Sequence, residues 1–372
     1  MNTRKKRGLE DLNKKLIFQT PLTPPKNELF TTPKRTEILK YHFKGTSVNR
    51  TIIYLRSDIG CEHGVKTGGC TGCGHWRDGT AGKTLNIPNM YVKQYLAAIK
   101  DNGLNPVMCL YNEGSMLNPK EVPLEQLVFI VQHLANNGVQ KLILESRSEH
   151  IKENILVSLK KSTQEMEIEI GMGLESANTF IRNELFLKST TLKSYEEAVN
   201  LLGKYGFNSL AYVLIKPPFL NEAQAIHDSI NTVKYALSIG TEAVCLEPFG
   251  VAQYTITQML YDRGLFQPPK LWSVIKVVEE TFGEGEIRIG GFQFEPRPTT
   301  VPQNCEHCTD KVLTAFSEYN HTFEIDCLTS LMCSHCYPTF LEEIETLPKH
   351  IDEAELYQKV SQFVEENKFS TQ

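Results

Sequence analysis

Short apolar segments alternate with longer segments of helical periodicity over most of the chain. Six apolar runs predict buried strands, and each is followed by a stretch whose apolar residues recur at helical spacing. The strands are expected at 51–57, 106–112, 141–146, 167–175, 209–215 and 243–249, and the helices at 89–103, 123–138, 151–162, 194–206, 222–240 and 269–283. Six strand–helix units in a row indicate parallel strands joined by right-handed crossovers.

Such a series forms either a doubly wound sheet or a partial barrel. Both architectures place their chemistry at the carboxyl ends of the strands. We therefore expect an α/β fold whose functional residues follow the strands. A further strand candidate lies near residue 287, and residues 351–368 predict an amphipathic closing helix.

Composition divides the chain into three parts. Residues 1–45 are rich in Pro, Thr and Lys, and their eleven basic and four acidic residues give +7, although the whole chain carries −5. We expect a partly disordered leader there, either solvated or acting as a basic arm that touches an anionic partner such as RNA. Residues 46–290 contain the strand–helix core, and residues 291–372 form a Cys-rich C-terminal extension.

The overall composition is that of a globular protein. Of the 372 residues, 41% are apolar and 22% charged, which is enough to build a core without disulfides. No apolar run is long enough to span a membrane, and no secretory signal is recognisable. Ten cysteines in such a chain are expected to be ligands in the reducing cytosol rather than disulfides.

A glycine-rich loop after the first predicted strand carries three thiols, Cys61, Cys70 and Cys73. One interpretation is a closed zinc site with His63 or His75 as the fourth ligand. The other is a [4Fe–4S] cluster, in which three thiolates leave one iron open to the amino and carboxylate groups of S-adenosylmethionine (SAM). The position after a strand and the lack of a nearby second CxxC pair favour the cluster.

A second cysteine group occupies the C-terminal extension. Two CxxC pairs are separated by twenty-four residues, a pattern typical of a four-cysteine zinc site that would staple this region to the core. An auxiliary iron–sulfur cluster and unligated thiols are the alternatives. The pairs are Cys305 with Cys308 and Cys333 with Cys336; Cys327, His307 and His335 are competing ligands, and Cys109 and Cys245 are expected to be buried free thiols.

The chain resembles the radical SAM superfamily, in which a cysteine-rich loop follows the first strand of a partial (β/α)6 TIM-type barrel. The eight residues between Cys61 and Cys70 exceed the frequent CxxxCxxC spacing, as in the branch that includes the elongator catalytic subunit. Within the superfamily the chain is most similar to the radical SAM proteins of archaeosine synthesis. The resemblance covers about residues 50–340 and is carried by RSDIGCEHGVKTGGCTGCGHWRDG, EGSMLNPKEVP, LESRSEHI, IGMGLESANTFIRN, YVLIKPPFLNEAQAI, GLFQPPKLWSVIKV and PQNCEHC.

This resemblance implies roles for residues that follow the strands. The three cysteines of the glycine-rich loop correspond to the cluster ligands. Asn112, Glu113 and Gly114 stand where such enzymes hold the SAM amino group, although the family form there is Gly-Gly-Glu. Glu175 is a further candidate for cofactor binding.

Three residues are implied as catalytic. Glu145 and Arg147 match the family's Glu-x-Arg element near SAM or substrate, and Lys216 is a substrate-side candidate. The alternatives are structural: a simple ion pair between Glu145 and Arg147, and a solvated turn residue at Lys216. Trp272 is expected in a helix core rather than as a stacking platform.

The resemblance implies a radical SAM enzyme that uses a [4Fe–4S] cluster and SAM to generate a 5′-deoxyadenosyl radical. Its implied substrate is a modified 7-deazaguanine in tRNA, where a lysine adduct is cleaved to leave an amidine. Implied partners are tRNA, an enzyme that supplies the adduct and a flavodoxin- or ferredoxin-like electron donor, with no membrane. Two alternatives stay open: a radical SAM enzyme for a peptide or small metabolite, and a non-catalytic zinc protein.

Overall fold

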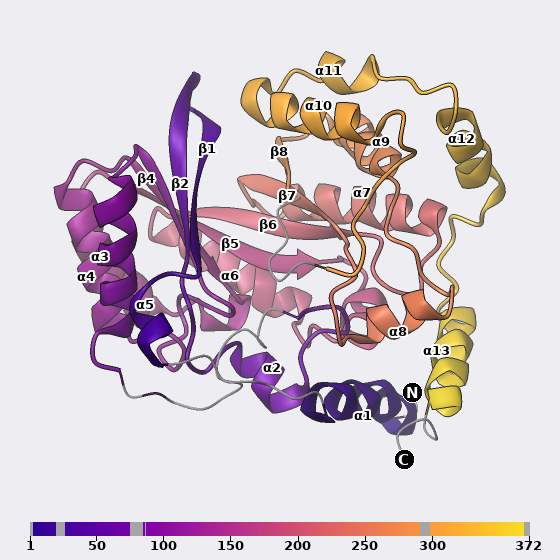
Figure 1. The fold of residues 1–372 in the computed structure, drawn as a ribbon, viewed down its shortest axis with the longest axis horizontal. Coiled ribbons are helices and arrows are strands. Elements are labelled where there is room, and N and C mark those ends of the chain that lie inside the picture. Colours follow the sequence, from indigo (N-terminus) through magenta and orange to yellow (C-terminus); the bar gives the residue numbers. More distant parts are fainter. Residues whose placement is uncertain (1–2, 20–26, 75–84, 86, 291–297, 368–372) are drawn as a thin grey trace.

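A curled, eight-stranded sheet forms the centre of the structure (Figure 1). The computed structural model describes residues 3–19, 27–74, 85, 87–290 and 298–367. The strands lie in chain order across the sheet; β2 to β8 are parallel, and β1 pairs antiparallel with β2 at the edge. They are β1 Arg35–Phe43, β2 Thr46–Tyr54, β3 Val107–Tyr111, β4 Lys141–Ser146, β5 Glu167–Glu175, β6 Asn208–Ile215, β7 Ala243–Pro248 and β8 Glu286–Ile289.

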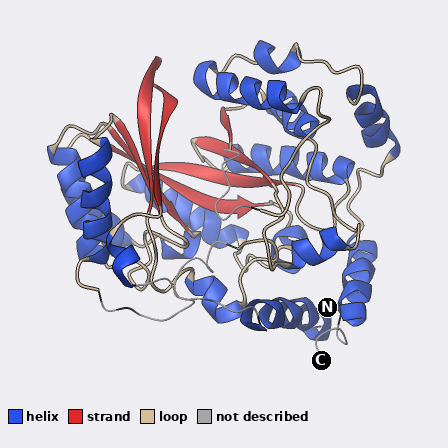
Figure 2. Ribbon diagram, in the orientation of Figure 1, coloured by secondary structure: helices blue, strands red, loops and turns tan. Residues whose placement is uncertain are grey.

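Helices follow the parallel strands in turn, so the expected partial (β/α)6 barrel with an α/β fold is confirmed (Figure 2). All six predicted strand–helix units are present, and the helix ends differ from the prediction by one or two residues. The helices of these units are α3 Met90–Asn102, α4 Leu124–Asn136, α5 Glu153–Thr163, α6 Leu192–Lys204, α7 Glu222–Ser238 and α9 Leu271–Thr281, with α2 Glu62–Thr67 and α8 Ile256–Asp262 in the loops.

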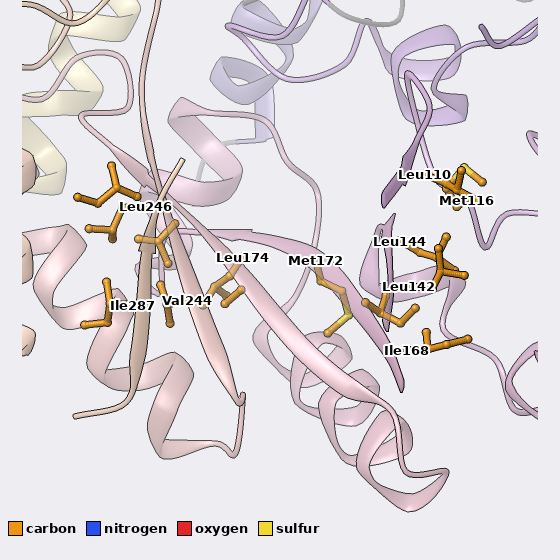
Figure 3. Packing of buried hydrophobic residues seen from close by; sticks show 14 of the residues in the cluster. Leu110, Met116, Leu142, Leu144, Ile168, Met172, Leu174, Val244, Leu246 and Ile287 are labelled. Atoms are coloured by element: carbon orange, nitrogen blue, oxygen red, sulfur yellow. The ribbon is translucent and has the colours of Figure 1, made fainter. Parts of the chain in front are cut away.

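Successive residues of each strand point alternately to the two faces of the sheet, so the side chains form two layers. Leu142 and Leu144 of β4, like Val244 and Leu246 of β7, are fully buried between the sheet and the surrounding helices (Figure 3). Each such side chain contributes roughly 1.5–3 kcal/mol by leaving water. The alternate residues, such as Ile143, point to the barrel interior. The sequence therefore needs apolar residues on both faces, which explains the continuous apolar runs.

A buried ionic network fills the interior at the amino ends of the strands. Glu169 of β5 accepts two hydrogen bonds from Arg288, at 2.5 and 2.9 Å, and one from Lys141 at 2.8 Å. Burial alone would raise the pKa of Glu169, but Arg288 and Lys141 outweigh it and lower the pKa to about 2. The network closes this end of the barrel, so the opposite end is left for chemistry.

Glu169→Gln is expected to destabilise the fold by roughly 3–5 kcal/mol, because it leaves two buried cations without their partner. The folded-state pKa of Glu169 is depressed, so its contribution to stability is present above about pH 4.5 and is lost as the pH falls toward 2. Urea unfolding of both proteins from pH 7 to pH 3 measures this. The control is Glu167→Gln on the same strand, which breaks only the exposed pair with Lys44 and should cost below about 1 kcal/mol. Equal effects of the two substitutions would contradict the prediction.

Part of the expected leader is folded onto the core. The range 1–45 contains helix α1 (Thr3–Gln19), the 3-10 turn η1 (Asn27–Thr31) and strand β1. Leu9 and Leu12 of α1 are buried against helix α13. The basic and Pro/Thr-rich composition hides the apolar positions that hold this segment. Composition alone therefore gives too little weight to a few well-placed leucines.

Helices α10 Thr309–Thr322, α11 Asp326–Thr329, α12 Tyr337–Thr346 and α13 Glu353–Asn367 make up the C-terminal region. The first three pack on the outside of the barrel, against β1, β8, α7 and α9. The last returns to the side where α1 lies (Figure 1). The closing helix was predicted, and its contact with α1 was not. No helix among the described residues has the length and apolarity that crossing a membrane requires.

Candidate functional site

The three-cysteine loop leaves strand β2 at the carboxyl side of the sheet. Its first cysteine, Cys61, directly precedes the short helix α2, which fills the eight-residue gap to Cys70. Gly68 ends α2 with φ +88°, and Gly69 follows with φ +74°. Both values lie in the left-handed region that glycine adopts readily. The glycines therefore allow a sharp turn of the chain between α2 and Cys70.

Distant parts of the chain hold this loop in place. The buried Asn13 of α1 donates to the carbonyls of Gly68 and Gly69 at 2.9 and 3.0 Å. Thr71 donates through its backbone to Phe186 and through its hydroxyl to Leu185, at 3.1 and 3.0 Å. Asn13 is thus a positioning residue that the sequence pattern missed, because it lies in the presumed leader.

The thiols of this loop are shielded from water. Cys70 is buried and Cys61 and Cys73 are partly buried, and none of the chain's ten cysteines forms a disulfide. Burial raises the pKa of Cys70 to about 11, while Lys188 and Arg147 act in the opposite direction. Two cations therefore lie within electrostatic range of the loop, where they can balance the negative charge of a thiolate-bound group.

The alternative of a closed zinc site in this loop finds little support. Both ring nitrogens of His63 are engaged, Nε2 with the Leu187 carbonyl at 2.9 Å and Nδ1 with Thr67 at 3.1 Å. His75 lies outside the described residues. Thiolates that share one zinc ion lie about 3.8 Å apart, given Zn–S bonds of about 2.3 Å. Among the described residues, no trio of ligand atoms within 4.8 Å of one another includes Cys61, Cys70 or Cys73.

The segment after β3 packs directly on the cysteine loop. A Cβ added to Gly114 would lie 2.9 Å from Cα of Cys61 and only 1.9 Å from Oε2 of Glu121. Glu121 accepts from the backbone of Glu62 at 2.9 Å and of Ser115 at 2.5 Å, so it joins the two loops. The predicted segment Asn112–Gly114 therefore lies beside the first cysteine. Within it, Glu113 accepts from Ser57 N at 3.4 Å, and Asn112 accepts from Gly114 N at 3.3 Å.

Gly114→Ala is expected to cost roughly 2–4 kcal/mol of stability and to loosen the cysteine loop, because its methyl group has no room beside Glu121 and Cys61. Chemical unfolding and the retention of iron after desalting measure the two effects. Gly203→Ala is the control: no atom lies within 4 Å of an added Cβ there, and alanine in helix α6 should stabilise by up to about 1 kcal/mol. An unchanged iron content and stability in Gly114→Ala would contradict this packing.

Glu145 and Arg147 do not form the simple ion pair considered as an alternative. Oε1 of Glu145 accepts from the Tyr212 hydroxyl at 2.9 Å. Arg147 instead donates to Glu149 at 2.5 Å and to the Lys188 carbonyl at 2.7 Å. Burial raises the pKa of Glu145 to about 7, partly opposed by Tyr212. Their catalytic roles stay predictions, with Arg147 turned toward the cysteine loop and Glu145 toward the interior.

The two remaining strand-end residues have internal partners. Glu175, with φ +66°, pairs with Lys188 at 2.5 Å. Lys216, with φ +65°, pairs with Glu222 at 2.5 Å, and Glu222 also accepts from Ser273 of α9. Lys216 is therefore not the solvated turn residue considered as an alternative. Its pair with Glu222 joins the end of β6 to helices α7 and α9, and a substrate-side role for it stays a prediction.

Sequence reasoning missed three residues of the interior: Glu247 of β7, Tyr212 of β6 and Lys188 after β5. Burial raises the pKa of Glu247 to about 8, and the neighbouring charges of Glu145 and Glu175 add to this. A signal for Glu247 was present, because a glutamate in the apolar run AVCLEP has the same place as Glu145 in KLILES. No local pattern marks Lys188.

The four C-terminal cysteines converge on one point. Sγ of Cys305 lies 3.6 Å from that of Cys308 and 3.5 Å from that of Cys333, and Cys308 and Cys336 are 3.5 Å apart. All four sulfur atoms lie within 4.8 Å of one another. These separations approach the ~3.8 Å of four thiolates around a single tetrahedral ion. The two CxxC pairs thus form a closed four-cysteine group.

Helix α9 supplies a hydrogen bond to this group. Trp272, fully buried as expected, donates from Nε1 to Sγ of Cys336 at 3.2 Å, and its ring packs on Tyr337 at 4.7 Å. Cys327 is not part of the group and contacts the Glu324 carbonyl, while His307 and His335 stack on each other at 4.0 Å. The four-cysteine group therefore lies on the outer face of the barrel, away from the three-cysteine loop.

Three curated proteins are similar to the chain. An uncharacterized protein of Methanocaldococcus jannaschii is 30% identical over 64% of the chain and 66% of its own length. Two proteins named archaeosine synthase subunit beta are 25% identical (Methanosarcina acetivorans, 73% of the chain and 79% of the relative) and 26% identical (Thermococcus kodakarensis, 50% and 58%). The chain is a homologue of the archaeosine synthase beta subunits. No protein-family model matches it.

Among solved structures, an archaeal Elp3 from Methanocaldococcus infernus is 13% identical with a TM-score of 0.46, over 65% of the chain and 60% of that protein. SuiB of Streptococcus suis, solved with S-adenosylmethionine, is 12% identical with a TM-score of 0.46, over 64% of the chain and 50% of that protein. At these TM-scores the structural similarity adds no information about the fold beyond the strand order described above.

Proposed function

We propose that the chain is a radical SAM enzyme that modifies a 7-deazaguanine base in tRNA. The observation that carries the proposal is the three-cysteine loop. Its three thiols come from one glycine-rich loop, which Asn13 holds in place at the carboxyl ends of the strands of a partial barrel. Arg147 and Lys188 lie within electrostatic range of this loop. Homologues named archaeosine synthase subunit beta support the choice of substrate.

The residues fit a [4Fe–4S] cluster. Cys61, Cys70 and Cys73 would each hold one iron, and sulfur atoms that do not converge on one point suit a group of several metal atoms better than a single ion. When bound, the cluster and SAM together supply a 5′-deoxyadenosyl radical that abstracts hydrogen from a substrate.

The chain's own residues orient and shield this chemistry. The packed backbone of Asn112–Gly114 beside Cys61 offers polar groups to the amino end of SAM. Arg147 and Lys188 provide positive charge against the thiolates, and the burial of Cys70 limits the access of solvent to the loop. Glu145 and Glu175 remain candidates for contacts to the ribose, the adenine or the substrate.

The proposed substrate is a tRNA base that carries a lysine adduct, and the proposed product is an amidine. The +7 charge of residues 1–45 suits a polyanionic partner, and this segment includes α1, which touches the cysteine loop through Asn13. A partner subunit that supplies the adduct and a flavodoxin- or ferredoxin-like electron donor complete the proposal. A peptide or small metabolite is the rival substrate class.

We also propose zinc for the four-cysteine group, as a structural ion. Four thiolates with separations near those of a tetrahedral ion, plus the Trp272 N–H donor, are typical of a closed site. In an auxiliary iron–sulfur cluster the four cysteines would bind more than one iron, so their sulfur atoms would not all surround a single point.

The test uses anaerobically reconstituted protein with SAM, reductant and tRNA that bears the lysine adduct. Loss of the adduct, together with formation of 5′-deoxyadenosine, is the expected result. SAM cleavage that tRNA does not stimulate, with the adduct left intact, would overturn the tRNA substrate and favour the peptide or metabolite class.

A further inference from the structure

Three parallel strands of the barrel carry the same dipeptide at or next to their carboxyl ends. Leu174–Glu175 ends β5, and Leu144–Glu145 and Leu246–Glu247 each stop one residue before the end of β4 and β7. In each pair the leucine is buried toward the helices, so alternation turns the glutamate to the barrel interior. The three carboxyl groups lie close enough for Glu145 and Glu175 to affect the charge of Glu247. Three carboxyl groups therefore lie near one another in the barrel interior.

These three carboxyl groups differ in their partners. Glu175 is neutralised by Lys188 at 2.5 Å. One oxygen of Glu145 is occupied by the Tyr212 hydroxyl. Oε1 of Glu247 accepts from the Cys245 thiol at 3.1 Å, and a thiol is a weak donor. Within the part of the chain that the structure describes, no Lys, Arg or His nitrogen lies within 4 Å of either Glu145 or Glu247.

The side chain of Glu247 lies inside the barrel but is not fully buried. Its side chain is partly exposed, although most residues of the strand around it, from Ala243 to Leu246, are buried. Burial makes the charged form of this carboxyl group costly, and its raised pKa means that it is largely protonated at neutral pH; a ligand with hydrogen-bond donors would favour the ionised form. Because the side chain is only partly buried, a ligand can contact it.

Gly290, directly after β8, leaves room for this carboxyl group. A Cβ added to Gly290 would lie 2.5 Å from both oxygens of Glu247. The carboxyl group therefore packs against this glycine, and a larger residue there would displace it. In its ionised form it has two acceptor oxygens, which match a ligand that presents two parallel N–H donors.

We propose that Glu247 is a specificity residue that accepts the ring N–H and the exocyclic amine of the substrate base. A 7-deazaguanine presents this pair of donors on its pyrimidine edge, whereas 7-deazahypoxanthine has the ring N–H alone. This assignment rests on the proposed function, because the substrate class comes from there. Glu145, held by Tyr212, is the weaker candidate because one of its oxygens is already used.

Equilibrium binding of 7-deazaguanine and 7-deazahypoxanthine to the full-length protein tests the proposal. The wild type should bind 7-deazaguanine about 10- to 100-fold more tightly, the range for a hydrogen bond to a charged group. In Glu247→Gln the preference should fall to about threefold or less, because the amide replaces one acceptor with a donor. Glu242→Gln, the same substitution at the other end of β7, should keep the preference.

The comparison of the two bases on the wild type requires no variant, so misfolding of Glu247→Gln cannot hide the answer. Equal binding of the two bases, no measurable binding of 7-deazaguanine at millimolar concentration, or a retained preference in Glu247→Gln would each overturn the assignment. So would a variant that loses affinity for SAM and keeps its base preference. Failure of the proposed function is seen separately, as absent 5′-deoxyadenosine formation by a protein that contains iron and sulfide.

Discussion

Cys70→Ala is expected to lose the iron–sulfur cluster and to lower SAM cleavage by on the order of 10³-fold or more, since the cofactor carries the radical chemistry. Cys70 is the most buried thiol of the three-cysteine loop, and the charges of Lys188 and Arg147 act on it. Alanine removes the ligand without adding volume, so the loop should keep its fold. Iron and sulfide content after anaerobic reconstitution, with visible absorbance, measures the effect.

Cys327→Ser is the matched control. Cys327 is a partly exposed thiol of α11 that hydrogen-bonds to the backbone carbonyls of Ala315 and Glu324 and belongs to neither cysteine group. It should bind as much iron as the wild type. Full iron and sulfide content in Cys70→Ala, or an equal loss in Cys327→Ser, would contradict the assignment of the loop.

Cys308→Ser should remove one zinc ion per chain and destabilise the C-terminal helices by at least about 3 kcal/mol. Structural zinc contributes roughly 10–16 kcal/mol in zinc-finger peptides, and the loss here is smaller because α10 also packs on β1 and β8. Serine keeps the size of the side chain but not the thiolate, so the effect reports metal binding rather than packing. Hydrogen exchange of α10 and α12, with metal analysis, measures it.

The barrel serves as the internal control for this second prediction. Exchange protection of β4 and β5, and the iron content of the three-cysteine loop, should stay near wild type because the four-cysteine group lies on the outer face. A variant that loses iron instead of zinc would show that the C-terminal cysteines hold an iron–sulfur cluster. Unchanged zinc and unchanged exchange would contradict a structural ion.

The barrel was predictable because its signals are local and repeated. Each strand is a short apolar run, and each helix shows its period and, in α3, a closing glycine. The N-terminal segment was not predictable in the same way. Leu9, Leu12 and Asn13 acquire their roles only through contacts with α13 and the cysteine loop, which lie far away in sequence. Contacts of this kind do not produce a periodic pattern of apolar residues in a charged segment.

The candidate site was predictable only in part for the same reason. The cysteine spacing marks both cysteine groups, the Glu-x-Arg element marks Glu145, and its position at a strand end marks Glu175. Glu247 was missed because none of the family motifs includes it, although a glutamate in an apolar run was a local signal. Lys188, Tyr212 and the Trp272 contact with Cys336 depend on how the elements pack. Partners of a charged group cannot be assigned before the sheet order is known.

The most direct test of the central claim is the formation of 5′-deoxyadenosine from SAM and dithionite by anaerobically reconstituted protein. The account predicts that the wild type forms 5′-deoxyadenosine and methionine in equal amounts, and that the triple variant Cys61→Ala, Cys70→Ala, Cys73→Ala forms neither. A wild-type protein with intact iron and sulfide that makes no 5′-deoxyadenosine, even with adduct-bearing tRNA present, would contradict it. So would a protein that binds only zinc at both cysteine groups.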